Sequence, residues 1–297
     1  MSGGRGSTDG DDRQDVADGG ALLTPRTVTR LLAQHGLAPR KSAGQNFVVD
    51  PNTVRHIVAA AGLGADDEVL EIGPGLGSLT LGLAEVARSV TAIEIDAGFV
   101  GVLEELFAGR DDVVVVHADA LSVDLDDVVG GRSVRAVANL PYNVATPLLF
   151  ALLDARSVVD AYVMVQREVG ERWQARVGDA PYSGVSLKLA LLADVRIERS
   201  IPRTVFYPVP NVDSVMVRVT RRDDAPDPAT YAELAALVDA AFSQRRKTLR
   251  NTLRTVAGPE TLEAAAATAD IDLGARAETL DVGAVRALAE ALAGARP

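Results

Sequence analysis

The chain has 297 residues, 47% of them hydrophobic, which is enough for one large domain with its own core and a second, smaller one. It contains no cysteine, so disulfides, thiolate catalysis and cysteine-ligated zinc are excluded. Its three histidines are scattered along the chain, which disfavours a histidine metal centre. No apolar run approaches the roughly eighteen residues of a membrane span, and no charged-then-apolar leader opens the chain. We therefore expect a cytoplasmic protein with no metal and no membrane partner.

The formal net charge of −11 is unfavourable for binding a phosphate backbone, but the charge is unevenly distributed. Residues 1–20 contain five Asp, two Arg and six Gly, a composition typical of a disordered acidic tail. Residues 21–49 and 242–254 each carry basic side chains and no acidic one. In the second segment an apolar stripe on a helical wheel runs beside an arc of Arg246, Lys247, Arg250 and Arg254. That arc is either an ordinary solvated face or, as two acid-free basic segments indicate, a surface for an anionic partner.

From residue 68 onward, short β-branched runs alternate with segments of helical length, the signature of parallel βαβ units. The last two runs are joined by a Pro-rich link, residues 201–212, which favours an antiparallel last strand. We expect a doubly wound α/β sheet that binds its ligands at the carboxyl ends of its strands. The predicted strands are Glu68–Ile72, Val90–Ile95, Val113–His117, Val134–Asn139, Ala161–Gln166, Val195–Arg199 and Ser214–Thr220.

Residues 223–228 carry two prolines and three aspartates and are typical of a linker. Beyond them the apolar spacing predicts only helices, which indicates a small all-helical domain. These helices are expected over Tyr231–Phe242, Gln244–Arg254, Thr261–Ala269 and Val282–Leu292. The sequence therefore predicts a tail over residues 1–20, an α/β domain over 21–222 and a helical domain over 223–297.

The first predicted strand enters a helix through a Gly-rich turn, with glycines at 73, 75 and 77. Glycine lets the backbone turn sharply and lets a ligand lie against it. A dinucleotide-binding turn is similar, but its third glycine is replaced here by Ser78. Pro74 also lacks an N–H with which to hold a pyrophosphate. A nucleoside without phosphate, such as a sulfonium nucleoside, fits this turn better.

Two carboxylates follow the next strands. Glu94 comes about 20 residues after the turn, where a carboxylate can accept both hydroxyls of a ribose, whether of NAD or of S-adenosylmethionine. Asp119 follows the third strand and is placed to accept a hydrogen bond from an adenine amino group, although a loop or cap aspartate is the alternative. Their place in a series of strand ends favours a cofactor site.

Asn139, Leu140, Pro141 and Tyr142 follow the fourth strand and form the most informative motif. The Asn139 side-chain oxygen and the Leu140 carbonyl can both accept hydrogens of an exocyclic amino group, which draws its nitrogen toward a pyramidal shape and frees the lone pair. Pro141 biases Leu140 toward an extended backbone. The Tyr142 ring can stack on a base. This set predicts methyl transfer to a nitrogen of a nucleic-acid base.

Together, three motifs and the glycine turn resemble the rRNA adenine dimethyltransferases. The motifs are Lys-Ser-Ala-Gly-Gln-Asn-Phe at 41–47, Asn-Leu-Pro-Tyr at 139–142 and Phe-Tyr-Pro-Val-Pro-Asn-Val-Asp-Ser at 206–214, and the similarity runs from about Thr27 to Arg254. The resemblance implies a class I (Rossmann-like) methyltransferase that uses S-adenosyl-L-methionine. It places the cofactor on Asn46, Val48, Gly73, Gly75, Glu94, Asp119 and Asn139. One departure is Val48, where leucine is usual; a backbone contact there is unaffected.

The resemblance also implies catalytic positions: Asn139, Leu140 and Tyr142, with Phe206 on the other face of the target base. A core aromatic at a Pro-rich turn is the alternative for Phe206. Two branches of the family differ in substrate. One dimethylates two adjacent adenines in the 3′-terminal hairpin of small-subunit (16S) rRNA during 30S ribosome biogenesis. The other modifies one adenine of large-subunit rRNA and confers macrolide resistance.

The form of the first motif, the segment Pro181–Leu187 and the helical tail resemble the small-subunit branch. We expect a monomeric RNA-binding enzyme of that branch, with the helical domain contributing to RNA binding. Two other readings stay open at this point. The protein could act chiefly as a non-catalytic small-subunit assembly factor, or it could be an NAD-dependent small-molecule enzyme, which the missing fingerprint glycine and the basic segments disfavour.

Overall fold

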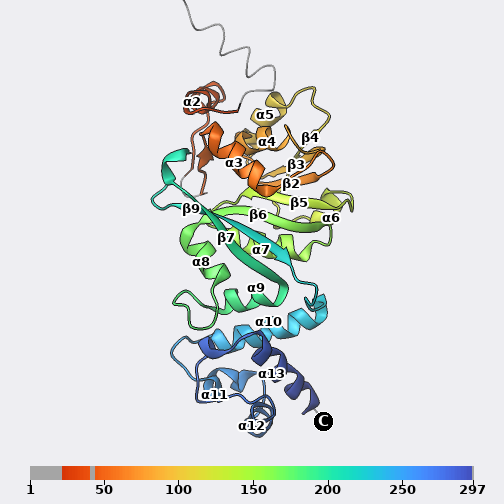
Figure 1. Ribbon diagram of the computed structural model, residues 1–297, viewed down its shortest axis with the longest axis vertical. Helices are drawn as coiled ribbons and strands as arrows, with labels where there is room; N and C mark the ends of the chain where they lie inside the picture. The colour runs from red at the N-terminus through yellow and green to blue at the C-terminus, as the bar shows by residue number, and fades with distance from the viewer. Residues whose placement is uncertain (1–21, 41–43, 296–297) are drawn as a thin grey trace, which may run out of the picture. The chain divides into compact units, whose positions relative to one another are not determined.

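Seven strands form one sheet in the order β4-β3-β2-β5-β6-β9-β7 (Figure 1). The computed structural model describes residues 22–40 and 44–295, so the tail predicted over residues 1–20 lies outside the described residues. The strands are β2 (Glu68–Ile72), β3 (Ser89–Glu94), β4 (Val113–His117), β5 (Val134–Asn139), β6 (Val158–Gln166), β7 (Ala193–Ile201) and β9 (Ser214–Arg221).

Strands β2 to β6 pair in parallel, and their registers align the ends of neighbouring strands. Ile72 lies opposite Ile93, Glu94 lies opposite His117, and β5 pairs with both β2 and β6. The last strand, β9, lies between β6 and β7, the place of an antiparallel closing strand in such a sheet. The predicted α/β fold class with an antiparallel last strand is confirmed.

Helices connect the parallel strands, and local sequence sets where they begin. In α3, for example, Asp50 accepts a hydrogen bond from the backbone of Thr53 at 2.9 Å, Pro51 occupies the first turn, and Gly62 ends the helix in the left-handed region. The helices up to β7 are α2 (Pro25–Gln34), α3 (Pro51–Ala61), α4 (Ser78–Leu83), α5 (Ala97–Leu106), α6 (Leu125–Val128), α7 (Ala145–Asp154), α8 (Arg167–Gln174) and α9 (Gly184–Leu192).

Two short strands, β1 (Phe47–Val48) and β8 (Phe206–Tyr207), form a separate antiparallel pair, with Val48 opposite Phe206. A 3₁₀ turn, η2 (Arg203–Val205), leads into β8. Both Val48 and Phe206 belong to the main hydrophobic core, which also takes in buried residues of α2 to α5. The β1–β8 pair therefore fixes the residues just after Asn46 against that core.

By their packing, the described residues separate into two compact units. Those up to residue 167 and residues 198–217 form the first, and residues 168–197 and those after 217 form the second. Strands β7 and β9 run from one unit into the other. The second unit thus takes in α8 and α9 as well as the chain after β9. The boundary between residues 222 and 223 that separates the two predicted domains stays a prediction.

The second unit has its own hydrophobic core, built by α9 and the helices after β9. Its first long helix, α10, begins where Asp227 caps the backbone of Ala229 and Thr230, with Pro228 in the first turn. The blue end of the chain in Figure 1 contains α10 (Pro228–Phe242), α11 (Leu249–Thr252), η3 (Leu253–Thr255), α12 (Pro259–Thr268), η4 (Ala277–Thr279) and α13 (Val282–Gly294).

The helix predicted over Gln244–Arg254 is wrong. Helix α10 ends at Phe242, the hydroxyl of Ser243 bonds back to the Ala240 carbonyl at 2.7 Å, and only 249–255 is helical again. The N–H groups of Leu249 and Arg250 donate to the carbonyls of Ala275 and Leu273, each at 2.9 Å. These long-range bonds take the backbone out of a continuous helix, so the predicted basic arc is an exposed turn followed by a short helix.

Of the residues that the structure describes, no helix is both long and apolar enough to cross a membrane.

Candidate active site

A cavity of about 470 Å³ opens at the carboxyl ends of β2, β3, β4 and β5. The residues predicted to bind the cofactor all line it: Asn46, Val48, Gly73, Gly75, Glu94, Asp119 and Asn139. They come from segments far apart in the sequence, and the parallel register of the sheet brings their strand ends together. The structure does not assign their roles, which stay predictions.

The Gly-rich turn needs glycine for two separate reasons. Gly73 and Gly75 have φ angles of 72° and 59°, a region that other residues rarely adopt. A Cβ on Gly75 would also lie 2.7 Å from the ring of Phe47. The turn can therefore keep this close approach to β1 only with glycine at position 75.

Glu94 is held by two backbone groups at the end of β3. The N–H of Gly75 donates to one carboxylate oxygen at 3.0 Å, and the N–H of Asp96 donates to the other at 2.9 Å. The side chain is 5% exposed, and burial raises the pKa of its carboxyl group. Each oxygen keeps a further lone pair, so both can also accept ligand hydroxyls.

Asp119 caps its own loop. One of its carboxylate oxygens accepts from the N–H of Leu121 at 2.9 Å, and the other accepts from the Ser122 hydroxyl at 3.2 Å. These contacts are the ones expected if Asp119 is an ordinary loop aspartate, the alternative to a cofactor role. Asp119 nevertheless lines the cavity, so the same carboxylate can hold the loop and accept a further hydrogen bond there.

Asn139 is the last residue of β5, and the two polar atoms of its side-chain amide differ in their hydrogen bonding. Its Nδ2 donates to the Asn46 carbonyl at 2.9 Å. Its Oδ1 is buried and accepts no hydrogen bond from the described part of the chain. An unpaired buried oxygen of this kind is rare in native proteins and indicates a missing donor. The Asn139 oxygen is thus available to a ligand in the cavity.

The segment before Asn46 is tied to the end of β3. The Arg40 guanidinium pairs with the Asp96 carboxylate, and the Gln45 amide donates to the same carboxylate at 3.4 Å. Gln45 also accepts from the Arg40 N–H at 2.8 Å. The Asp96 backbone meanwhile contacts Glu94. One aspartate therefore links the residues leading to Asn46 with the carboxylate predicted to bind the ribose.

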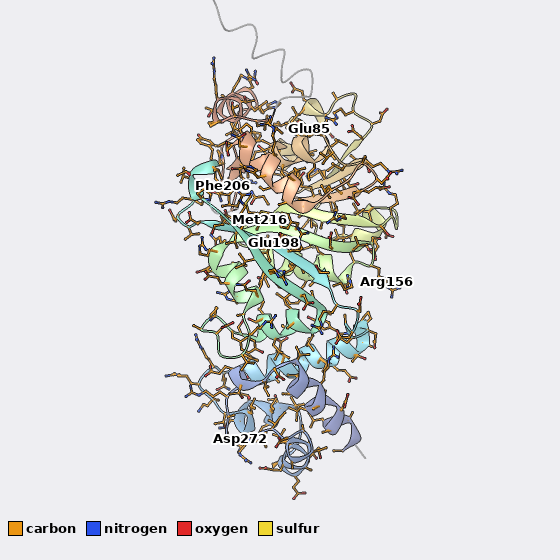
Figure 2. All side chains as sticks on the ribbon, in the orientation of Figure 1. Glu85, Arg156, Glu198, Phe206, Met216 and Asp272 are labelled. Carbon is orange, nitrogen blue, oxygen red and sulfur yellow. The ribbon has the colours of Figure 1, made fainter. Side chains whose placement is uncertain are left out.

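Three predicted catalytic residues, Leu140, Tyr142 and Phe206, do not line this cavity. The Leu140 N–H donates to the Met164 carbonyl at 3.1 Å, and its side chain is buried. The Tyr142 hydroxyl bonds to that of Ser214 at 2.7 Å, and burial raises the pKa of Tyr142. Phe206, which Figure 2 labels, is 2% exposed and part of the core. It offers no open face here, so its stacking role stays a prediction.

The comparisons with known proteins give the family of the chain. Residues 36–293 match the family model described as ribosomal RNA adenine dimethylase. The chain belongs to the ribosomal RNA adenine dimethylase family. It is 48% identical to the ribosomal RNA small subunit methyltransferase A of Thermobifida fusca, over 93% of this chain and 98% of that one. It is 46% identical to the protein of the same name in Streptomyces coelicolor, over 91% and 96%.

Solved structures show the same fold. The crystal structure of the 23S rRNA methyltransferase ErmE is similar with a TM-score of 0.63 and 28% identity, covering 83% of this chain and 99% of that one. A dimethyladenosine transferase from Plasmodium falciparum gives a TM-score of 0.64 and 27% identity, covering 80% and 94%. Membership of the ribosomal RNA adenine dimethylase family makes the chain an rRNA methyltransferase, with S-adenosylmethionine as the methyl donor.

The residues present fit this donor. The cavity volume lies in the ordinary range for small-molecule sites. Its lining includes the carboxyl groups of Glu71, Glu94 and Asp119, whose oxygens can accept from the ammonium group and the ribose hydroxyls of S-adenosylmethionine. The unpaired Asn139 oxygen adds an acceptor.

Several lining residues were not predicted from the sequence. Ile95 and Leu121 are 64% and 42% exposed, unusual for large apolar side chains, and they lie next to Glu94 and two residues after Asp119. The signal that could have found them is an apolar residue within a few positions after a strand end, where polar turn residues are expected. Glu71 was hidden inside an apolar strand; it is 1% exposed and accepts from the Thr80 hydroxyl at 2.6 Å.

Proposed function

We propose that this chain uses S-adenosylmethionine to dimethylate N6 of two adjacent adenines in the 3′-terminal hairpin loop of small-subunit (16S) rRNA, during assembly of the 30S subunit. The observation that carries the chemical part is the Asn139 side chain, whose nitrogen is fixed by the Asn46 carbonyl and whose buried oxygen lacks a donor. The choice of small-subunit RNA rests on the relatives at 43–48% identity that carry that name.

Each part of the cofactor is proposed to lie against residues at one of the strand ends. Glu94 accepts the ribose hydroxyls, because both of its oxygens are held in place by backbone N–H groups. Asp119 accepts from the adenine amino group, and the exposed Ile95 and Leu121 cover the adenine ring. Gly73 and Gly75 leave room for the amino-acid part, while Asn46 and Val48 close the cavity from β1.

The target amino group lies between two acceptors. Asn139 Oδ1 accepts one of its hydrogens and the Leu140 carbonyl accepts the other. Pro141 biases Leu140 toward an extended backbone, which suits a carbonyl turned toward the target, and the Leu140 N–H is engaged with the Met164 carbonyl. Both hydrogens are then held away from the lone pair, which is left directed at the methyl group.

When bound, S-adenosylmethionine supplies a methyl group on a positively charged sulfur. The chain supplies no general base at the nitrogen, since the Asn139 amide and the Leu140 carbonyl only accept hydrogen bonds. The methylated nitrogen is acidic and loses its proton to water. The contribution of these residues is therefore positioning, which can supply roughly 7–11 kcal/mol when the reacting atoms are aligned.

Tyr142 is the residue proposed to hold the target base outside its stack. Its hydroxyl is anchored by Ser214, which restrains the ring, and Tyr142 lies two residues after Leu140 in the chain. Stacking on an aromatic ring contributes about 1–3 kcal/mol per base. Phe206 can take the opposite face only if the β1–β8 pair shifts, because its ring is buried.

The protein is proposed to act as a cytoplasmic monomer on the precursor 30S subunit. The second unit supplies basic side chains for this substrate: Arg245, Arg246 and Lys247 lie in an exposed turn after α10. Cations placed this way bind phosphates without reading sequence. The binding of RNA phosphates by this turn is part of the proposal.

Methyl transfer from labelled S-adenosylmethionine tests the proposal. The substrates are small ribosomal subunits that lack the two dimethyladenosines, with large-subunit RNA in parallel and Asn139→Ala as the inactive variant. Asn52→Ala is the matched control, because Asn52 is an exposed asparagine of α3 that does not line the cavity. We expect dimethyladenosine in small-subunit RNA with the wild type and the control, and none with Asn139→Ala.

Two results would contradict this assignment. Label in large-subunit RNA alone would move the protein to the resistance branch. Label in neither RNA, with saturable binding of precursor subunits by both wild type and Asn139→Ala, would support the reading as a non-catalytic assembly factor.

A further inference from the structure

Two buried polar atoms without partners lie on the same cavity. Among the described residues, the buried side-chain nitrogen and oxygen atoms that make no hydrogen bond are Ser78 Oγ, Asn139 Oδ1 and Arg286 Nε. Ser78 and Asn139 both line the cavity at the strand ends. A buried hydroxyl without a partner destabilises a fold, so such atoms at a binding site indicate groups that a ligand satisfies.

The position of Ser78 explains why the fold itself does not satisfy it. Ser78 is the first residue of α4, directly after Gly77, and is 5% exposed. A serine inside a helix can bond to the carbonyl four residues earlier. Here that carbonyl belongs to Pro74, in the turn before the helix, and it accepts the Gly77 N–H at 3.0 Å. The Ser78 hydroxyl makes no hydrogen bond to that carbonyl or to any other described residue.

Apart from the exposed Asn143, which also lines the cavity, the other side-chain amide and guanidinium groups of the lining already donate within the protein. Arg40 and Gln45 donate to Asp96, the Asn46 amide donates to the Gly44 carbonyl at 3.1 Å, and the Asn139 amide donates to Asn46. Glu94 and Asp119 only accept hydrogen bonds when ionised. Ser78 therefore provides the cavity with a buried hydroxyl hydrogen that no described residue binds.

We infer that the Ser78 hydroxyl donates a hydrogen bond to the α-carboxylate of the cofactor's methionine part. This inference rests on the proposed function, which places the amino-acid part against Gly73 and Gly75. That part ends in an ammonium and a carboxylate. The lining offers the carboxyl oxygens of Glu94 and Asp119 to the ammonium group, whereas a carboxylate needs donors, and the hydroxyl three residues after Gly75 is one.

Ligands that differ only in the amino-acid part give the test. Isothermal titration calorimetry compares wild type and Ser78→Ala with three probes: S-adenosylhomocysteine, decarboxylated S-adenosylmethionine, and methylthioadenosine, which lacks the whole amino-acid part. We expect Ser78→Ala to lower the affinity for S-adenosylhomocysteine about tenfold, as for the loss of a hydrogen bond to a charged group. The affinities for the other two probes should stay within about twofold.

The stability of the ligand-free protein gives an independent readout. Ser78→Ala removes an unpaired buried hydroxyl, so its melting temperature should equal or exceed that of the wild type. Ser157→Ala is the matched control, because Ser157 is a buried serine ahead of β6 that does not line the cavity. It should leave the affinity for all three probes unchanged.

Three outcomes would overturn the inference: unchanged affinity for S-adenosylhomocysteine, an equal loss for decarboxylated S-adenosylmethionine, or a marked loss of stability without ligand. The last two would give Ser78 a structural role. Failure of the wild type to bind any of the probes would instead contradict the proposed function itself, so the two failures are distinguishable.

Discussion

The side-chain nitrogen of Asn139 donates a 2.9 Å hydrogen bond to the backbone carbonyl of Asn46, a residue 93 positions earlier in the chain. A backbone carbonyl can only accept, so this contact decides which end of the amide faces the cavity. The end that remains is the oxygen, and it has no partner among the described residues. The motif at the end of β5 is therefore oriented by the segment that precedes β1.

Replacement of Asn139 should affect the chemical step. In Asn139→Asp a carboxylate oxygen would face the Asn46 carbonyl, and Asn139→Ala has neither the donor nor the acceptor. We expect kcat to fall about 100-fold or more in both variants, as for the loss of one hydrogen-bonding group in a transition state. Single-turnover methylation of small subunits measures this. A rate within threefold of the wild type for Asn139→Ala would contradict the role.

Asp96 should influence cofactor binding although it does not line the cavity. Asp96→Asn keeps a side-chain oxygen for the N-cap of α5 but loses the charge that holds Arg40. Because Arg40 is largely exposed, the pair is worth about 0.2–1 kcal/mol. The Kd for S-adenosylmethionine should rise roughly two- to fivefold, equally in Arg40→Ala and in the double variant.

An ion pair elsewhere in the first unit is the control for Asp96. Asp66 pairs with Arg88 at 2.6 Å, and Asp66→Asn should leave the cofactor Kd unchanged. Additive losses in Arg40→Ala and Asp96→Asn would show that the two side chains act separately, against the linkage seen here.

Glu71 should make stability depend on pH. Burial, with a smaller effect of the nearby Glu94 charge, raises the pKa of the Glu71 carboxyl to about 8, from an ordinary value of 4.5. Between these values the folded protein holds a proton that the unfolded chain has released, so the free energy of unfolding falls as pH rises from about 4.5 to 8. The loss is on the order of a few kcal/mol.

Glu71→Gln should flatten this dependence, since glutamine keeps an acceptor for the Thr80 hydroxyl and cannot ionise. Denaturant unfolding at pH 6 and pH 9 measures it, with Glu104→Gln, an exposed glutamate of α5, as the control. If wild type and Glu71→Gln lose the same stability between these pH values, the Glu71 proton is not the cause.

Much of the sheet could be predicted from the sequence, because its parallel strands are short β-branched apolar runs separated by segments of helical length. The bounds of β2, β4 and β5 agree residue for residue with the prediction, and Glu94 and Asp119 follow from them. Strands β1 and β8 were not predicted, since two residues carry no periodicity. The segment 244–254 fits a helical period, yet tertiary backbone bonds to Ala275 and Leu273 override it.

The contacts between residues of the site could not be predicted from the sequence for a different reason. Arg40 and Asp96 are 56 residues apart, and no local pattern pairs them. The sequence indicated that Asn46 and Asn139 belong to the cofactor site. It did not indicate that the Asn46 carbonyl orients the Asn139 side chain. For Phe206 the sequence motif indicates a function, but only the structure shows that the ring is buried. That burial decides whether a target base can reach the ring.

Tyr142 and Phe206 should respond differently to substitution. Tyr142→Phe keeps the ring and loses only the bond to Ser214, so kcat/KM should fall by no more than about threefold, whereas Tyr142→Ala should lose the stacking energy of about 1–3 kcal/mol. Phe206→Ala should cost about 3–5 kcal/mol of stability, as for a core aromatic. Thermal unfolding and methylation kinetics of the three variants measure this.

Phe206→Leu separates the two readings of that residue, because leucine fills much of the core volume but cannot stack. Methylation close to the wild-type rate would leave Phe206 a core residue only. A large loss of kcat/KM at nearly unchanged stability would establish the stacking role.

The exposed turn after α10 should govern RNA affinity. Arg245, Arg246 and Lys247 are exposed, whereas Arg250 pairs with Glu263, so the first three are the side chains to change. With all three replaced by glutamine, the logarithm of RNA affinity should fall less steeply with the logarithm of salt, by about 0.7–0.9 for each phosphate that is no longer neutralised. Filter binding of small-subunit RNA at several salt concentrations measures the slope.

The affinity for S-adenosylmethionine should be unchanged in this triple variant, because the cavity belongs to the first unit and the turn to the second. Arg55→Gln, an exposed arginine of α3, controls for a general change in charge. Since the whole chain carries a net charge of −11, binding of a polyanion requires that its cations be concentrated somewhere. An unaltered salt slope in the triple variant would therefore place the RNA surface on other basic residues.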